Sequence, residues 1–476
     1  MGTRVDVIGW GGDGMAIVNA LVEVVARHED LWSVFRSSSE VSRLNDAVRD
    51  AACCHDEHGD EALSAAGHAR CHDGAGGEGP SPNGGARTDA AHRSASSPDC
   101  VTASASVTDV PDTPLRRPQP SREGAADAGG GPGLVVSEDT DRLLRDALAL
   151  AEATGGAFNP MIGPLVAAWD VKAMRAAFVA GRPLPPAPSS RVVEAALRAS
   201  SWHLLSRVGE RRWTLLAPAD AASGSGARGL PAHARGLPAD ARGHVSGDGH
   251  PFDASRENQA AGASSEGSRV SATDGRRHRD GVPCPRLDLG GIAKGYTADA
   301  CRDLAVSMGA RGVLVSVGTS SVSVFGTRAD GSPWRAGVRD PNGAPTAVSG
   351  VVELPVGDMA SLSTSGDNLG PMGRVRAWAA PDPVSDPHAR ETSRETPGGG
   401  GRIFDHHIID PRTGYPAHAG VRQVSVVASS GVLAEALSTA LLVDPSIDVP
   451  DVVARWARVT GAPASAKVVG LVRAAR

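Results

Sequence analysis

Glu435 and Thr439 are the residues of this chain whose types and spacing best suit metal-assisted chemistry. They lie four residues apart in a segment, 431–442, that is expected to be helical, so both side-chain oxygens face the same side. Hard oxygen donors of this kind are the ligands that Mg²⁺ prefers. The alternative is a solvated helix face on which Thr439 bonds to its own backbone.

Lys294 is a second candidate, because it lies in the first turn of an expected helix over 292–308. A lysine there acts as a point charge beside the helix N-terminus, a combination that suits a diphosphate. Asp288 precedes it at the end of an expected strand, where an acid could accept hydrogen bonds from a ribose or an adenine. The alternative for Lys294 is an ordinary surface lysine.

His407 and Asp410 are the candidate catalytic residues, and they flank two isoleucines just before the turn 411–414. A histidine with a pKa near neutrality can take the proton of a hydroxyl group, or it can donate to a phosphate oxygen. His407 could equally be held by the backbone of the turn. Asp410 could likewise be the first residue of an Asx turn.

Gly9, Gly11 and Gly14 form a G-x-G-x-x-G pattern between an expected strand and an expected helix, and Glu40 could serve as its ribose-binding acid. Glu40 lies well beyond the second expected strand, however, and no repeated βαβ units follow. Binding of a nicotinamide dinucleotide is therefore a disfavoured alternative.

The overall composition excludes several classes of protein. The 476 residues carry a net charge of −6, which does not indicate a nucleic-acid-binding surface. No apolar run reaches the roughly 18 residues of a membrane span, and the N-terminus lacks the pattern of a signal peptide. The six cysteines show no zinc-binding spacing. We therefore expect a cytoplasmic protein with no membrane span and no nucleic-acid partner.

The apolar residues are concentrated in parts of the chain separated by low-complexity stretches. Such stretches cannot bury enough apolar surface to offset the entropy lost on ordering, so we expect them to be disordered insertions in one composite domain. The foldable segments are 1–50, 134–217, 284–381 and 403–476, and the expected insertions are 51–133, 218–283 and 382–402.

Hydrophobic periodicity predicts a mixture of strands and helices without strict βαβ alternation, which favours the α+β class. Strands are expected at 4–8, 31–35, 313–317, 322–325, 334–338, 351–355 and 423–428. Helices are expected at 15–28, 137–154, 292–308 and 431–442. Ser137 is the expected N-cap of the second helix, and Gly155-Gly156 its end.

Seven short motifs follow one another through the foldable segments. They are Met1-Gly2-Thr3, 39–45, 155–160 with 163–166, 288–296, 364–367, 407–414 and 434–440. In this order they closely resemble the ApbE family, the FAD:protein FMN transferases. The resemblance covers the chain outside the insertions.

The resemblance implies a single α+β domain that takes FAD as its substrate and Mg²⁺, or alternatively Mn²⁺, as its metal. The acceptor would be a Ser or Thr hydroxyl of another protein that carries an FMN-binding domain. That hydroxyl would attack the phosphorus on the FMN side, and AMP would leave. Charge develops on phosphate oxygens in such a reaction, so positioning and a cation matter most.

The resemblance also implies roles for individual residues. The metal ligands are Glu435, Thr439 and the main-chain carbonyl of Gly291. The FAD contacts are Lys294, Asp288, the main chain of Ile409, the loop residues Ala157, Phe158 and Asn159, and, against the flavin, Met1 and Phe35. An aromatic ring such as Phe35 offers the flavin a stacking surface, whereas the alternative is a phenylalanine packed in the core.

Three positions depart from the family pattern. Glu435 stands where the family usually has Asp, Asn159 replaces another Asp, and Gly318-Thr319-Ser320 replaces Gly-Gly-Asp. The longer side chain of Glu435 bears on metal affinity and on the choice between Mg²⁺ and Mn²⁺. Two alternatives follow: an FAD pyrophosphatase, in which water replaces the acceptor hydroxyl, and a non-catalytic FAD-binding protein.

Overall fold

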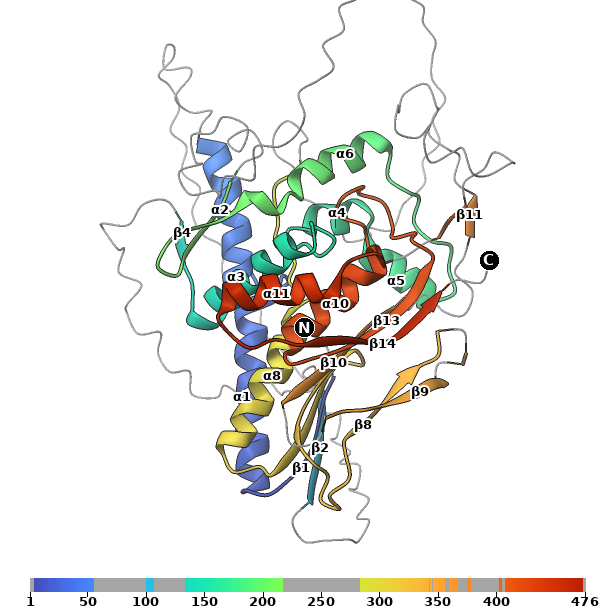
Figure 1. Ribbon diagram of the computed structural model, residues 1–476. Helices are drawn as coiled ribbons and strands as arrows, with labels where there is room; N and C mark the ends of the chain where they lie inside the picture. Colours follow the sequence, from blue (N-terminus) through green and yellow to red (C-terminus); the bar gives the residue numbers. More distant parts are fainter. Residues whose placement is uncertain are drawn as a thin grey trace, which may run out of the picture.

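The computed structural model describes residues 4–54, 100–106, 133–216, 283–341, 343–344, 346–355, 359–366, 375–377, 402–404 and 407–473 (Figure 1). Met1, expected to contact the flavin, lies outside these residues. The described part combines antiparallel sheets with helices, so the expected α+β class is confirmed.

The central element is a seven-stranded sheet in the order β14-β13-β10-β7-β6-β1-β2. Every neighbouring pair in it is antiparallel. The strands are β1 (Arg4–Trp10), β2 (Cys100–Ser106), β6 (Gly312–Val317), β7 (Ser321–Gly326), β10 (Ala360–Gly366), β13 (Val421–Ala428) and β14 (Ala466–Arg473). This order contains none of the parallel βαβ units that a dinucleotide-binding motif requires.

Helices α8 (Ala293–Ser307) and α10 (Gly431–Val443) pack on the sheet and against each other. In Figure 1, α1 (Gly14–Trp32) runs beside α8, α3 (Glu138–Ala153) contacts α10, and α11 (Val449–Thr460) packs against α3. Helix α10 is buried on almost all sides, because it is apolar all round. It is therefore the central helix of the main core.

Opposite the helices, a hairpin of β8 (Arg335–Arg339) and β9 (Val348–Glu353) borders the sheet. Trp334 and Leu354 at its base pack with Val324 and Leu362 in a separate apolar cluster. The remaining elements are α2 (Glu40–Cys54), β3 (Leu134–Val135), α4 (Gly163–Ala168), α5 (Val171–Val179), α6 (Ser190–Ala199), η2 (Trp202–Leu204), β4 (Leu205–Gly209), β5 (Arg212–Leu215), β11 (Val375–Ala377) and β12 (Arg402–Phe404).

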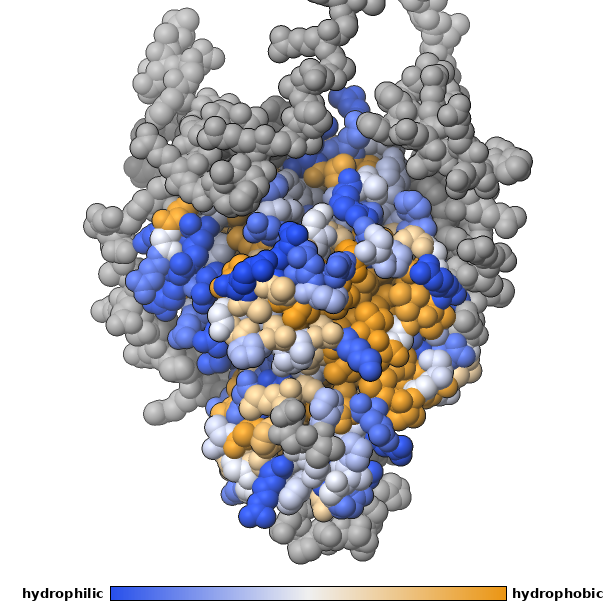
Figure 2. Space-filling view, viewed as in Figure 1, coloured by the Kyte–Doolittle hydropathy of each residue, from blue (hydrophilic) through white to orange (hydrophobic). Residues whose placement is uncertain are grey.

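Strand β14 forms one edge of the large sheet, and its outward side chains alternate with inward ones. Val469 and Leu471 are each 37 % exposed on it. Figure 2 shows apolar surface over the region of β13 and β14. Among the residues that the structure describes, no helix has the length and apolarity needed to cross a membrane.

Several local expectations are confirmed. Ser137 caps α3 by accepting a hydrogen bond from the Thr140 N–H, and Gly155 and Gly156 end this helix with φ values of +59° and +81°. Positive φ values are readily adopted only by glycine, which explains the pair at this position.

The strand predicted at 31–35 is wrong, because α1 continues to Trp32. The buried positions Leu21, Val25, His28 and Trp32 are three or four residues apart, which is the period of a helix. Trp32 is held by a 2.9 Å hydrogen bond from its Nε1 to the Thr140 Oγ1 of α3. A short apolar run at a helix end had the appearance of a strand.

The structure also places a strand within the range expected to be an insertion, because β2 pairs with β1 along its whole length. The glycine pattern before α1 forms a tight turn, in which Gly11 and Gly12 have φ values of +83° and +70°. A Cβ at Gly12 would lie 2.8 Å from the Met308 carbonyl. Glu40 accepts hydrogen bonds from the N–H and Oγ of Ser137, which gives it a structural role.

Helices α8 and α10 cross with their backbones in contact. A Cβ on Gly295 would lie 2.2 Å from the carbonyl oxygen of Gly431, and a Cβ on Gly431 would lie 2.4 Å from that of Gly295. Real Cβ atoms do not approach backbone this closely, so both positions require glycine. The contact brings the first turn of α8 against the first turn of α10.

Replacing Gly295 with alanine should therefore destabilise the fold. The added methyl group must separate two helices in a close-packed core, a change that typically costs about 1–3 kcal/mol. Denaturant unfolding of Gly295→Ala measures the loss. Gly350→Ala is the matched control, since a Cβ there meets nothing within 4 Å. Equal stability of the two variants would contradict the proposed helix contact.

Candidate functional site

Gly291, Thr439 and Phe158 meet at one point, although they come from three distant parts of the chain. A Cβ on Gly291 would lie 3.5 Å from the Phe158 ring and 4.0 Å from the Thr439 Oγ1. Gly291 lies in the turn before α8, Thr439 in the third turn of α10, and Phe158 in the loop after α3. The structure thus brings together two of the three predicted metal ligands and a predicted FAD contact.

Glu435, the third predicted ligand, is almost fully buried between α8 and α10, with 3 % exposure. Its Oε2 accepts a 2.7 Å hydrogen bond from the Gly295 N–H, and its Oε1 forms an ion pair with the Lys294 ammonium. The residue that precedes α8, Ile292, provides no side-chain cap. Glu435 therefore caps α8 from the neighbouring helix, where the helix dipole favours negative charge.

Ser365, at the end of β10, extends this group of oxygens. Its Oγ lies 3.1 Å from the Thr439 Oγ1 and 2.8 Å from the Ser438 Oγ. Ser438 also donates to the carbonyl of Glu435. Sequence reasoning did not single out Ser365, although it lies in the motif 364–367. The motif contains Ser365, but its sequence does not indicate which of its side-chain oxygens faces α10.

The predicted ligands at this point have the chemistry that suits a hard divalent cation. No cluster of three or more His, Cys, Asp or Glu side chains exists in the part of the chain that is described. The predicted set instead combines one carboxylate with a hydroxyl and a carbonyl, all of them oxygen donors. The buried carboxylate already holds a cation, Lys294, so the position favours positive charge.

The loop 157–160 is fixed by Asn159, which is 8 % exposed. Its Nδ2 donates to the carbonyl of Ser200 at 2.7 Å, and its Oδ1 accepts from the Met161 N–H at 2.8 Å. Ala157 and Phe158 are buried beside it. An ionised Asp cannot donate, so the Asn found here has a structural reason.

We expect Asn159→Asp to destabilise the protein by about 1–3 kcal/mol at pH 8, because the Ser200 carbonyl loses its donor. A protonated Asp can donate an O–H, so the loss should be smaller at pH 5. Unfolding by denaturant at the two pH values, each relative to the unsubstituted protein, tests this. The same loss at both values would show that the donor is not what matters.

Asp288 and the loop 157–160 lie against each other, since the Asp288 N–H donates to the carbonyl of Pro160 at 2.8 Å. The Asp288 Oδ1 accepts from the Gly290 N–H at 2.8 Å and so shapes the turn before α8. Asp288 is half-buried. The structure therefore places it next to the predicted metal ligands, with part of its surface accessible.

Asp410 forms the Asx turn that was the alternative to a catalytic role. Its Oδ1 accepts from the Arg412 N–H at 2.9 Å, and both of its oxygens receive the Arg412 guanidinium at 3.1 Å. Arg412 also donates to Asp444 at 2.7 Å, and hydrogen bonds from Ser446 and Arg412 together lower the pKa of the Asp444 carboxyl. Sequence reasoning missed Arg412. Asp410 is thus committed to holding the turn.

The residues that precede Asp410 differ in their burial. Ile409 is 4 % exposed and packs with Leu165 and Trp169 in a small cluster that also includes Met174 of α5. Its backbone forms an isolated bridge with Pro416. His407 is half-buried just before it.

Phe35 is 76 % exposed, in the segment between α1 and α2, so the alternative of a phenylalanine packed in the core is wrong for it. The Lys172 ammonium lies 5.1 Å from its ring centroid. Lys172 belongs to α5, the helix whose Met174 packs near Ile409. Phe35 and the turn 409–414 therefore border the same helical segment, and the exposed ring has Lys172 over one face.

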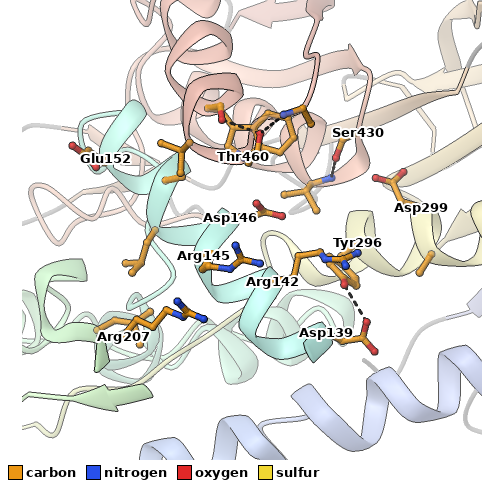
Figure 3. Close-up of a pocket in the computed structure, with 18 of the residues that line it drawn as sticks. Asp139, Arg142, Arg145, Asp146, Glu152, Arg207, Tyr296, Asp299, Ser430 and Thr460 are labelled. Atoms are coloured by element: carbon orange, nitrogen blue, oxygen red, sulfur yellow. Dashed lines mark hydrogen bonds between the residues drawn. The ribbon is translucent and has the colours of Figure 1, made fainter. Parts of the chain in front are cut away.

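A cavity of about 1,080 Å³ lies elsewhere, between α3, α8 and α11 (Figure 3). None of the predicted site residues lines it. Tyr296 donates to the Asp139 Oδ1 at its rim, and Asp146 points into it. Burial raises the pKa of Asp146 to about 6, although Arg145 and Arg142 oppose this shift.

The raised pKa of Asp146 predicts that the free energy of unfolding depends on pH. The folded state holds this proton more tightly than the unfolded chain, so wild-type stability falls as pH rises through the window from about 4 to about 6 and stays lowered above it. Relative to wild type, Asp146→Asn should gain about 1 kcal/mol between pH 5 and pH 8. Urea unfolding measures it, with the exposed Glu23→Gln as control. No gain would contradict the shift.

Comparison with known proteins matches the chain to the ApbE family over residues 117–228, 250–375 and 389–460. It is 27 % identical over 325 residues to the FAD:protein FMN transferase of Treponema pallidum, covering 67 % of this chain and 63 % of that protein. It is 33 % identical over 177 residues to that of Rhodobacter capsulatus, covering 37 % of this chain and 28 % of that one.

Among solved structures, the ApbE protein of Thermotoga maritima aligns with a TM-score of 0.49 at 20 % identity, over 99 % of this chain and 94 % of that one. The flavin transferase ApbE of Vibrio cholerae gives a TM-score of 0.49 at 16 % identity.

The family match spans more than half of the chain and includes all three predicted metal ligands. The chain therefore belongs to the ApbE family, the class of protein that its motifs and its α+β fold indicated. Phe35 and Met1 lie outside the matched residues. The chain spans less than two thirds of the length of each of the two relatives.

Proposed function

We propose that this protein transfers FMN from FAD to a Ser or Thr hydroxyl of another protein, with a divalent cation, Mg²⁺ or Mn²⁺, at Glu435, Thr439 and the Gly291 carbonyl. Its curated relatives in the family are named FAD:protein FMN transferases, which supports the proposal. The acceptor would carry an FMN-binding domain.

One observation carries the proposal: a buried carboxylate, a hydroxyl and a glycine turn from two distant motifs converge at the N-terminus of α8. Backbone N–H groups and the dipole of a helix N-terminus suit a diphosphate. A cation beside them would stabilise the charge that develops on the phosphate oxygens when AMP leaves. The convergence supplies both requirements in one place.

The other predicted residues take supporting roles in the proposal. Lys294, in the first turn of α8, contributes a point charge to the diphosphate, and Asp288 accepts from the nucleoside. The exposed ring of Phe35 stacks on the flavin. His407 handles the proton of the acceptor hydroxyl, since the Asp410 carboxylate is committed to Arg412.

The test is mass spectrometry of a flavoprotein FMN-binding domain after incubation with this protein, FAD and Mg²⁺. We expect a gain of one FMN on a Ser or Thr, release of AMP, and no gain in EDTA. Thr439→Val should lower the rate at least about tenfold, because it removes one oxygen from the cation. Thr460→Val, the same change at the end of α11, is the matched control.

Glu435→Gln separates the proposed metal-binding role of Glu435 from its role as the cap of α8. The amide oxygen can still accept from the Gly295 N–H, so the cap of α8 is preserved while the charge is lost. A folded but inactive variant would support the metal role, whereas full activity would contradict it. Free FMN and AMP without an acceptor would instead identify a pyrophosphatase, and FAD binding without turnover would identify a non-catalytic binding protein.

A further inference from the structure

Lys294 and the predicted metal would both use the Glu435 carboxylate. The Lys294 ammonium contacts the Glu435 Oε1 and donates to the carbonyl of Gly290, one residue before the predicted carbonyl ligand. A lysine ammonium is a compact, strongly hydrated point charge that pairs with hard oxygens, as a divalent cation does. The two cations therefore compete for one carboxylate.

Burial of the Glu435 carboxylate strengthens this competition. The Glu435 side chain is 4 % exposed, so its charge must be balanced by a neighbour. The Gly295 N–H supplies one hydrogen bond to Oε2, and Lys294 supplies the balancing charge at Oε1. A dication at the same oxygen would repel the ammonium, because both lie where solvent screening is weak.

The Lys294 ammonium is able to leave this ion pair. Its side chain is 24 % exposed, and its flexible four-carbon stem allows the ammonium to move toward solvent while the stem stays packed. The buried Glu435 has no such freedom, because the Gly295 N–H and the helix crossing hold it. Lys294 is therefore the partner that moves.

We propose that Lys294 is an internal counter-ion that occupies Glu435 until a divalent cation displaces it. The ammonium, no longer paired with Glu435, would then be able to pair with the FAD diphosphate near the α8 N-terminus. This inference rests on the proposed function for the identity of the anion, but not for the competition itself. Lys294 acts as a positioning residue that links occupation of the metal site to a positive charge at the phosphate site.

The test measures binding of Mn²⁺ alone, without FAD or acceptor, by electron paramagnetic resonance at constant pH and ionic strength. Lys294→Met removes the competing charge and keeps the stem, so its Mn²⁺ affinity should rise at least about tenfold over wild type. Lys294→Arg keeps a cation and should bind Mn²⁺ no more tightly than wild type. Lys467→Met, an exposed lysine of β14, is the control for the change in net charge.

A further variant and a second measurement establish which site binds the Mn²⁺. Glu435→Gln should abolish tight Mn²⁺ binding in both the wild-type and the Lys294→Met background, which shows that the measured site is the one at Glu435. Thermal unfolding should show a larger stabilisation by Mn²⁺ in Lys294→Met than in wild type, because the unpaired carboxylate regains a cation. Lys294→Gln, which also removes the charge and is expected to raise the Mn²⁺ affinity, covers the case in which Lys294→Met does not fold.

Unchanged or weaker Mn²⁺ binding by a folded Lys294→Met protein would overturn the inference. That outcome, together with normal FMN transfer by the wild-type protein, would leave the proposed function standing. Conversely, a rise in affinity with no FMN transfer to any acceptor would retain the competition and reject the transferase.

Discussion

The contact between the backbones of Gly295 and Gly431 is the constraint on which the rest of the site depends. Only two glycines allow α8 and α10 to cross so closely, and the crossing places Glu435, one turn further along α10, against the first turn of α8. Ligands from motifs about 140 residues apart then share one position. A wider crossing would leave Glu435 buried with neither the helix N-terminus nor Lys294 within reach.

This arrangement gives a physical reason for the longer acid in place of Asp. The Glu435 carboxylate reaches across the helix crossing to the Gly295 N–H at 2.7 Å while its second oxygen remains available to a cation. One residue thus closes the N-terminus of α8 and carries the charge of the site. Because the Glu435 carboxylate is held in this way, Lys294 is the residue of the pair that can change its position.

The sequence predicted the helices and strands around this site well, because their periodicities are long and their caps are explicit, as at Ser137 and Gly155. It failed at residues 31–35, where a short apolar run at a helix end has no period of its own. It failed also at β2, whose small and polar residues show no apolar pattern yet pair with β1. Pairing of backbone groups does not require apolar side chains.

For the site, motif order located most of the residues, but their roles depend on partners that are remote in sequence. Asn159 is explained by the Ser200 carbonyl, Asp410 by Arg412, and Ser365 by Thr439. None of these pairs has a spacing that could be recognised before the fold is known, except for the short Asx turn.

The three departures from the family's carboxylates are consequently not equivalent. Asn159 fixes a loop through a donor that an ionised Asp lacks, whereas the contacts at Thr319 and Ser320 do not explain the change there. Glu435 alone keeps a charge. Glu435 is the one carboxylate among the three predicted ligands. The balance between Lys294 and a divalent cation is therefore decided at its two oxygens, and any change in the reach of that carboxylate acts on both cations together.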